Sequence, residues 1–264
     1  MGHTRLGTLP QSRKWREVVE LIAVGANVQQ VASSTVNAAD SAFSFVKDDR
    51  GYHQAVWILT QLGLASSHSD PLAYLRSVGV DIPANTSLPG IAVAISAALS
   101  NLPDTRHPQS DLAELAHRAL VDAVVQRLEP KLQQQSLFNL DSEHARQALL
   151  QFGSQKEFAK LSREFFSRLT QECMNYFLSK TLATQLGEGQ RFVTTNQMAH
   201  FEEAMEKHCR ESSKIVEQFS EEWFSKHRFT ENKDISRESV EGFASYSLKK
   251  IRDELKVRAK RDDQ

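Results

Sequence analysis

The sequence predicts an all-α protein, with an alanine-rich N-terminal helical part followed by an antiparallel bundle of three long amphipathic helices. In the second half of the chain, apolar residues recur every three or four positions, which is the spacing of one helix face. No alternating run of apolar and polar residues bounded by turns indicates a sheet. The 264 residues are 40% hydrophobic and 25% charged, a composition typical of folded rather than disordered chains.

The distribution of charge divides the chain into two parts. Residues 1–140 contain 11 Lys/Arg and 12 Asp/Glu, whereas residues 141–264 contain 21 of each kind. Dense charge is typical of helices with one solvated face, so we expect shorter and more buried helices in the first part. A proline followed by a polar run at 129–136 marks the boundary. We therefore predict an N-terminal helical domain at 1–130, which begins with a basic arm, and a helical bundle at 141–264.

The N-terminal part should contain several short helices separated by Gly/Pro-rich loops. Ser12 is placed to cap a helix that runs through Trp15 and ends near Gly25. The stretch 28–46 is also predicted to be helical, although its valine and threonine content leaves a strand open. The further helices expected here cover residues 52–64, 71–78, 90–99 and 111–128.

The three long helices begin at recognisable capping residues. After a short helix at 141–152, Ser154 and Glu157 form a capping box that opens the first long helix. The second is predicted at 195–224, starts at Thr194, and forms the central strut of the bundle. The third is predicted at 236–258. The apolar stripe of the second helix consists of Phe201, Ala204, Met205, Ile215, Val216, Phe219 and Trp223.

Two polar residues, His208 and Ser212, fall inside that stripe and share one helix face. A buried polar group without a hydrogen bond costs on the order of 1–3 kcal/mol. We therefore interpret them as a buried, structural polar pair that is hydrogen-bonded in the core. The functional alternative is a pocket in which His208 acts as a base, proton donor or ligand.

The chain contains only two cysteines, Cys173 and Cys209, which excludes a disulfide framework and favours a reducing compartment. With His208 they could meet across the bundle and bind zinc, but the usual Cys and His ligand spacings are missing. We expect two buried free cysteines, with no metal and no cofactor. Arg191, after Gly187 and Gly189, could hold an anion at a helix N-terminus, although a helix end and linker explains this loop better.

Two local basic segments are candidate contact surfaces for a partner. Either could bind a protein or the phosphates of a nucleic acid, and Trp15 could stack on a base. Because the net charge is −1, we favour a protein partner over nucleic acid. For the C-terminal segment, cations at a helix C-terminus are the simpler explanation. The residues are Arg5, Arg13, Lys14, Trp15 and Arg16 in the arm, and Lys249, Lys250, Arg252 and Lys256 in the last helix.

No phosphate-binding loop, zinc-protease, serine-hydrolase or EF-hand motif occurs in the sequence. The N-terminus lacks a signal peptide, and the apolar segment at 90–99 is about half as long as a membrane span. We expect a cytoplasmic, non-enzymatic interaction or assembly subunit of a larger intracellular complex, compatible with a bacterial source. The oligomeric state stays open. The alternatives are a nucleic-acid-associated protein that uses the two basic segments, and an enzyme or ligand-binding domain around His208.

Overall fold

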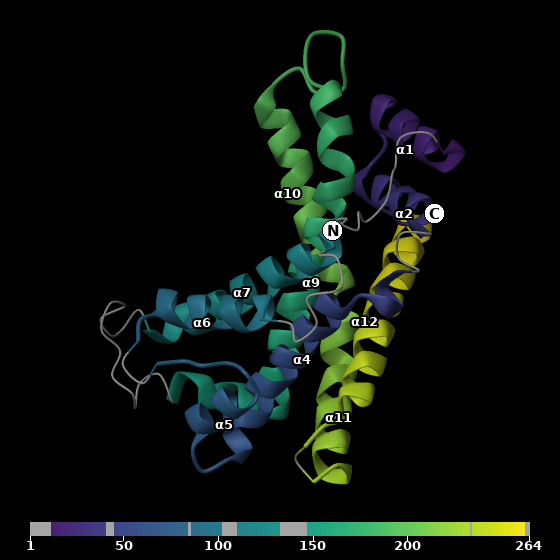
Figure 1. Cartoon of the computed structure of the whole chain (residues 1–264). Coiled ribbons are helices and arrows are strands. Elements are labelled where there is room, and N and C mark those ends of the chain that lie inside the picture. Colours follow the sequence, from purple (N-terminus) through teal and green to yellow (C-terminus); the bar gives the residue numbers. More distant parts are fainter. Residues whose placement is uncertain are drawn as a thin grey trace.

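A computed structural model describes residues 12–40, 45–83, 86–101, 110–132, 147–232 and 234–261 of the chain. Figure 1 shows that these residues build an assembly of helices. Within the described ranges there is no β-strand, and one isolated bridge between Leu186 and Phe192 closes a loop. The predicted all-α class is confirmed.

The N-terminal part consists of short helices with polar side chains at their starts. Ser12 accepts a hydrogen bond from the Trp15 backbone N–H, as predicted, and Asn27 forms a reciprocal capping box with Gln30. The stretch from residue 28 is helical and not a strand. The helices are α1 (Arg13–Ala23), α2 (Val28–Ala38), α4 (Arg50–Leu64), α5 (Pro71–Ser77), α6 (Leu88–Ser100) and α7 (Asp111–Leu132), with 3-10 turns at Phe45–Asp48 and Ala65–Ser67.

The C-terminal part contains the long helices. Ser154 and Thr194 cap two of them by accepting hydrogen bonds from the backbone N–H groups of Glu157 and Gln197, as predicted. The first half of the short helix predicted at 141–152 lies outside the described residues. Residues 147–150 are helical, as predicted, and a 3-10 turn follows at Gln151–Gly153. The helices are α9 (Gln155–Thr184), α10 (Thr195–Ser212), α11 (Lys214–Thr230) and α12 (Arg237–Arg261).

The prediction of one continuous helix over 195–224 is wrong, because the chain breaks at Ser213 into α10 and α11. The Ser213 hydroxyl donates to the Cys209 carbonyl (2.8 Å), a local bond that competes with regular helix geometry. The buried face changes across the break. Phe201 and Met205 are buried in α10, but Ala204 is exposed, and in α11 the half-buried Phe219 and Trp223 flank a buried face formed by Val216, Ser220 and Phe224.

The buried apolar side chains of the described helices form one continuous core, which reaches from Trp15 in α1 to Leu255 in α12. Within it, α4 is the most enclosed helix. From Gly51 to Leu64 only His53 and Trp57 are not buried. A helix that is apolar on all sides belongs in the interior. The centre of the fold is therefore α4, rather than the helix predicted at 195–224.

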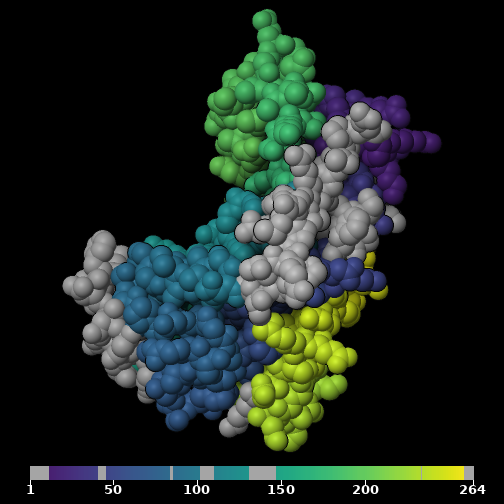
Figure 2. All heavy atoms as spheres, viewed as in Figure 1, coloured from purple at the N-terminus to yellow at the C-terminus, as the bar shows by residue number. Residues whose placement is uncertain are grey.

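The remaining helices are arranged around α4 and α9. Helix α9 packs against α7 and against α10 and α11, while α12 packs against α2, α4 and α11. The space-filling view in Figure 2 shows an outline that is indented between the α9–α10 end and the α6–α7 side of the molecule. Both chain halves therefore contribute to the same core and to the same surfaces.

Candidate functional site

Helices α7, α9, α10 and α11 border a polar groove with a volume of about 330 Å³. Four of its eight lining side chains are cations and two are carboxylates, so its lining is net positive. The lining residues are Gln126, Arg127, Lys160, Arg163, Glu164, Ser167, Arg210 and Glu217.

Helix α9 forms the floor of the groove. Lys160, Arg163, Glu164 and Ser167 follow one another at the spacing of three and four residues that places side chains on one helix face. This polar face lies opposite the apolar face of the same helix, which includes Phe158, Phe165 and other core residues. Because the apolar face of α9 packs into the core, its polar face is turned toward the groove.

Ion pairs hold three of these four cations in place, two of them by linking one helix to another. Arg163 binds Glu217 of α11 at 2.8 Å, and Glu157 binds both Arg127 of α7 and Lys160, the latter at 2.9 Å. Burial would raise the pKa of Glu157, but the Lys160 hydrogen bond and the charges of Arg127 and Lys160 outweigh it and lower the pKa. Glu157 therefore remains charged at neutral pH and keeps both cations oriented.

Arg210 differs from the other three cations of the groove. Its side chain is exposed, and within the described part of the chain it forms neither an ion pair nor a hydrogen bond. A free guanidinium presents its donors in a planar fork that matches a carboxylate or a phosphate. The groove can therefore accept an anionic group at Arg210 without breaking an existing pair.

The structure changes the interpretation of the N-terminal basic residues. Arg5 lies outside the described residues, and Arg13, Lys14 and Arg16 are exposed on α1. Trp15, in contrast, is only 5% exposed, so the prediction that it could stack on a base is wrong. It begins the buried stripe that Val18 and Ile22 continue.

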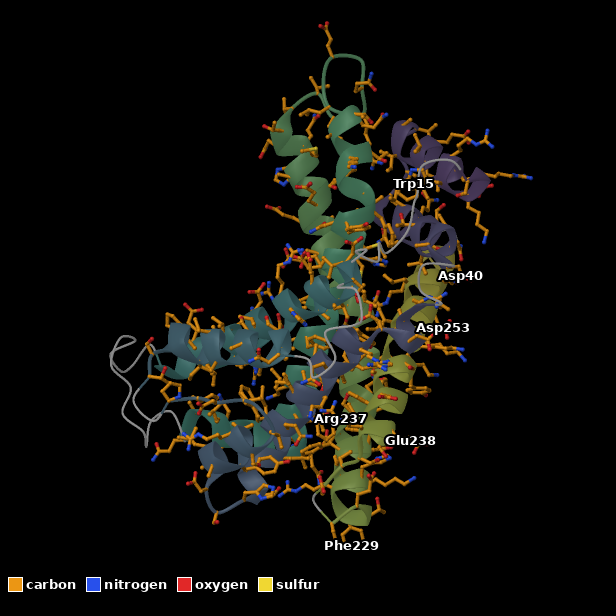
Figure 3. All side chains as sticks on the ribbon, in the orientation of Figure 1. Trp15, Asp40, Phe229, Arg237, Glu238 and Asp253 are labelled. Atoms are coloured by element: carbon orange, nitrogen blue, oxygen red, sulfur yellow. The ribbon has the colours of Figure 1, made fainter. Side chains whose placement is uncertain are left out.

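The C-terminal basic residues are partly used within the molecule. Arg252 pairs with Asp40, and the Lys256 ammonium lies 3.9 Å from the same carboxylate. Lys250 lies over the ring of Tyr246, and Lys249 is exposed. Figure 3 shows Asp40 beside the C-terminal half of α12 and Trp15 on the neighbouring α1. Because α1 and α12 both pack on α2, the fold places the two basic segments on either side of α2.

His208 and Ser212 are 7% and 0% exposed, so their predicted burial is correct. The Ser212 hydroxyl has no hydrogen-bond partner among the described residues, so it does not bond to His208, and the prediction that Ser212 is hydrogen-bonded in the core is wrong. Neither residue lines the polar groove. The pair is thus buried on the inner face of α10, away from the polar groove.

Cys173 and Cys209 are buried free thiols. Burial raises the pKa of both, that of Cys209 to about 12, so neither is an activated thiolate at neutral pH. In the described ranges no group of three His, Cys, Asp or Glu side chains is arranged to hold a metal ion. The zinc alternative therefore gains no support from the described geometry.

Arg191 serves the fold instead of an anion. Its guanidinium donates to the carbonyls of Ile22 (3.1 Å) and Ala26 (2.6 Å) and lies over the rings of Phe192 and Phe201. Ile22 lies in the last turn of α1 and Ala26 in the link to α2, so Arg191 ties the loop before α10 to the α1–α2 connection. The anion-binding alternative for Arg191 is therefore wrong.

The groove residues were missed at the level of sequence because charged positions on a helix usually form a solvated face. The available signal was the polar run at 160, 163, 164 and 167, opposite the phenylalanines of the same helix. The spacing within α9 does not show which residues of other helices lie next to this polar face. Arg127, Arg210 and Glu217 come from three other helices.

Comparison of the chain with known protein families, with curated proteins and with solved structures found no match. Among the described residues, no helix combines the length and the apolar character needed to cross a membrane.

Proposed function

We propose that this protein is a non-enzymatic interaction subunit that binds an acidic segment of a partner protein in the polar groove. The observation that carries the proposal is the uncommitted Arg210 beside three cations held in fixed positions. Carboxylates of a partner would bind to Arg210 and then share the donors of Arg127 and Arg163.

The chemistry of the groove fits a protein segment better than a small apolar ligand. Pockets for small molecules are mostly apolar, with a few polar groups that orient the ligand. Here all eight lining residues are polar or charged. Electrostatic complementarity of this kind favours orientation and a high association rate. The enzymatic alternative has less support, because His208 is buried away from the groove.

Affinity purification from the native host, compared between the unmodified protein and an Arg210→Glu variant, tests the proposal. Lys180→Glu is the matched control, since Lys180 is also an exposed cation and lies in α9 thirteen residues beyond the last groove residue of that helix. We expect Arg210→Glu to lose a partner that Lys180→Glu retains. Purified partner and a peptide of its acidic segment should then bind about tenfold or more weakly to the Arg210→Glu protein. Equal capture by both variants would refute the role of the groove.

Nucleic-acid binding is the second candidate, because the fold places the basic residues of α1 and α12 on either side of α2. Affinity for an oligonucleotide should then fall steeply with salt. Combined Arg13→Glu and Arg16→Glu substitutions should weaken it, while Arg210→Glu should not. Point substitutions are preferable to deleting residues 1–16, since that deletion would also remove the buried Trp15 from the core.

A further inference from the structure

The floor of the polar groove contains a hydroxyl group that the fold leaves without a partner. Ser167 lines the groove from α9, yet it is only 5% exposed. Among the described residues its hydroxyl forms no hydrogen bond, whereas the hydroxyl of Thr170, one turn further along α9, donates to the Phe166 carbonyl at 2.7 Å. An enclosed hydroxyl without a partner is unfavourable, so a group bound in the groove gains a donor at its floor.

The cations of the same groove have further N–H groups to offer. Arg210 has its whole guanidinium free, and the two cations of α9 use only part of their donors within the described residues. Lys160 donates one of its three N–H groups to Glu157 at 2.9 Å. Arg163 donates one of its five to Glu217 at 2.8 Å. These donors exceed what the two oxygens of a single carboxylate can accept in one place, and a group with three oxygens fits them better.

The charge of the groove matches a dianion. Two of its neighbours belong to the same network, because Glu157 pairs with Arg127 and Lys160, and Arg168 pairs with Glu164. The lining residues and these two neighbours together contain five cations and three carboxylates, which leaves a net charge of +2. A phosphorylated side chain carries about −1.5 to −2 at neutral pH, whereas one carboxylate carries a single charge.

The size of the groove favours one compact head group over a run of acidic side chains. Its volume of about 330 Å³ is at the lower end of the range for ligand pockets. Two aspartates or glutamates would have to enter together to bring a charge of −2. One phosphorylated side chain brings this charge in a single group, so less of the partner has to be ordered on binding.

We infer that the groove binds the phosphoryl group of a phosphorylated serine or threonine in a partner protein. The inference rests on the proposed function, because it names the acidic group that the partner presents. Arg210 binds phosphoryl oxygens through its planar fork, and the Ser167 hydroxyl donates to another oxygen at the floor of the groove. The eight described lining residues include no aromatic ring that could stack on a nucleobase, which favours a protein side chain over a nucleotide.

Titration of the ¹⁵N-labelled full-length protein with two blocked amino acids tests the inference directly. The probes are N-acetyl-O-phosphoserine amide and N-acetylglutamate amide, followed by NMR through the side-chain Nε–Hε signals of Arg163 and Arg210. We expect the phosphoserine probe to bind about tenfold or more tightly than the glutamate probe. Ser167→Ala and Arg210→Gln should each weaken binding of the phosphoserine probe about tenfold.

Ser162→Ala is the matched control for Ser167→Ala. Ser162 lies in the same helix, is 0% exposed, and its hydroxyl also lacks a hydrogen-bond partner among the described residues, but it does not line the groove. Its removal should leave the affinity for phosphoserine unchanged, and thermal unfolding shows whether each variant retains the fold. Equal binding of the two probes, or equal weakening by the two serine substitutions, would overturn the inference.

Phosphatase treatment of the host lysate separates this inference from the proposed function. A partner whose capture depends on Arg210 should be lost after the treatment, and its bound segment should contain phosphoserine or phosphothreonine. Capture that depends on Arg210 but survives phosphatase would support the binding of an acidic segment and overturn the phosphoryl inference. Binding of inorganic phosphate to the groove, without any phosphatase-sensitive partner, would assign the site to free phosphate and overturn it as well.

Discussion

Arg191 illustrates how a single side chain can join distant parts of this chain. The loop between α9 and α10 carries it to the end of α1, more than 160 residues away in sequence. There it satisfies two carbonyls and covers two phenylalanine rings at once. Burial lowers the pKa of the guanidinium, but not enough to neutralise an arginine at physiological pH. The charge-assisted bonds therefore persist across the working range.

We expect Arg191→Ala to lower the free energy of unfolding by about 2 kcal/mol, because both carbonyls lose a charged donor. Arg191→Lys should recover only part of this loss, since an ammonium cannot reproduce the planar fork. Chemical denaturation measures the effect. Glu188→Ala, an exposed position in the same loop, is the control and should change stability little. Similar losses in both variants would contradict the capping role.

At the scale of helices, the sequence predicted where helices begin more accurately than where they end or are interrupted. Ser12, Ser154 and Thr194 were recognisable because a cap is a local contact between a side chain and the next turn. The break at Ser213 was missed because the apolar spacing continues across it. The central position of α4 was missed for a different reason, since only its neighbours show which helix is enclosed on every side.

The same argument explains what was predicted about the candidate sites. The burial of His208 and Ser212 follows from helical spacing alone, so it was predictable. The groove forms because Arg127, Arg163 and Arg210 lie close together on three different helices. The spacing of residues within one helix cannot predict such a contact between helices. Trp15 was misassigned because its basic neighbours were given more weight than its own spacing to Val18.

One carboxylate stabilises the N-termini of two helices, and this leads to a prediction about those helices. Asp49 accepts from the Tyr52 backbone N–H (2.8 Å) at the start of α4 and also from the hydroxyl of Ser110, which in turn caps α7 by accepting from Ala113 N–H (2.9 Å). Gly51 permits this proximity, since a Cβ there would overlap Ala113. The N-termini of α4 and α7 are thus stabilised together.

Asp49→Ala should therefore cost about 2 kcal/mol of stability, more than removal of an ordinary cap. Asp70→Ala is the matched control, because Asp70 caps only the short α5, through Leu72 and Ala73, and should cost about 1 kcal/mol. Urea denaturation of both variants gives the comparison. Equal costs would show that the second helix start does not depend on Asp49.

At the scale of the whole molecule, stability should decrease on mild acidification. Burial lowers the pKa of His53 and His117 from their ordinary value of 6.5, and it outweighs the nearby charge of Asp49. The unfolded chain then binds these protons first. Stability is present above pH 6.5 and is lost as the pH falls below it, with a slope of at most about 1.4 kcal/mol per pH unit for each histidine.

Denaturation at a series of pH values between 7 and 5 should reveal this slope, and replacing His53 and His117 together by Gln should flatten it. His200→Gln is the control, since that side chain is exposed and should leave the slope unchanged. A slope that survives the double substitution would assign the acid sensitivity to other groups.

The position of α12 also has a consequence for biosynthesis. This last helix packs against α2 and α4, and the Ala244 carbonyl accepts a hydrogen bond from the hydroxyl of Tyr52, 192 residues earlier. At a translation rate of about 5 to 20 residues per second, these early helices wait about 10 to 40 s for their partner to leave the ribosome. During that interval the nascent chain exposes the apolar surface that becomes the centre of the fold, and it is the stage at which a chaperone would be needed most.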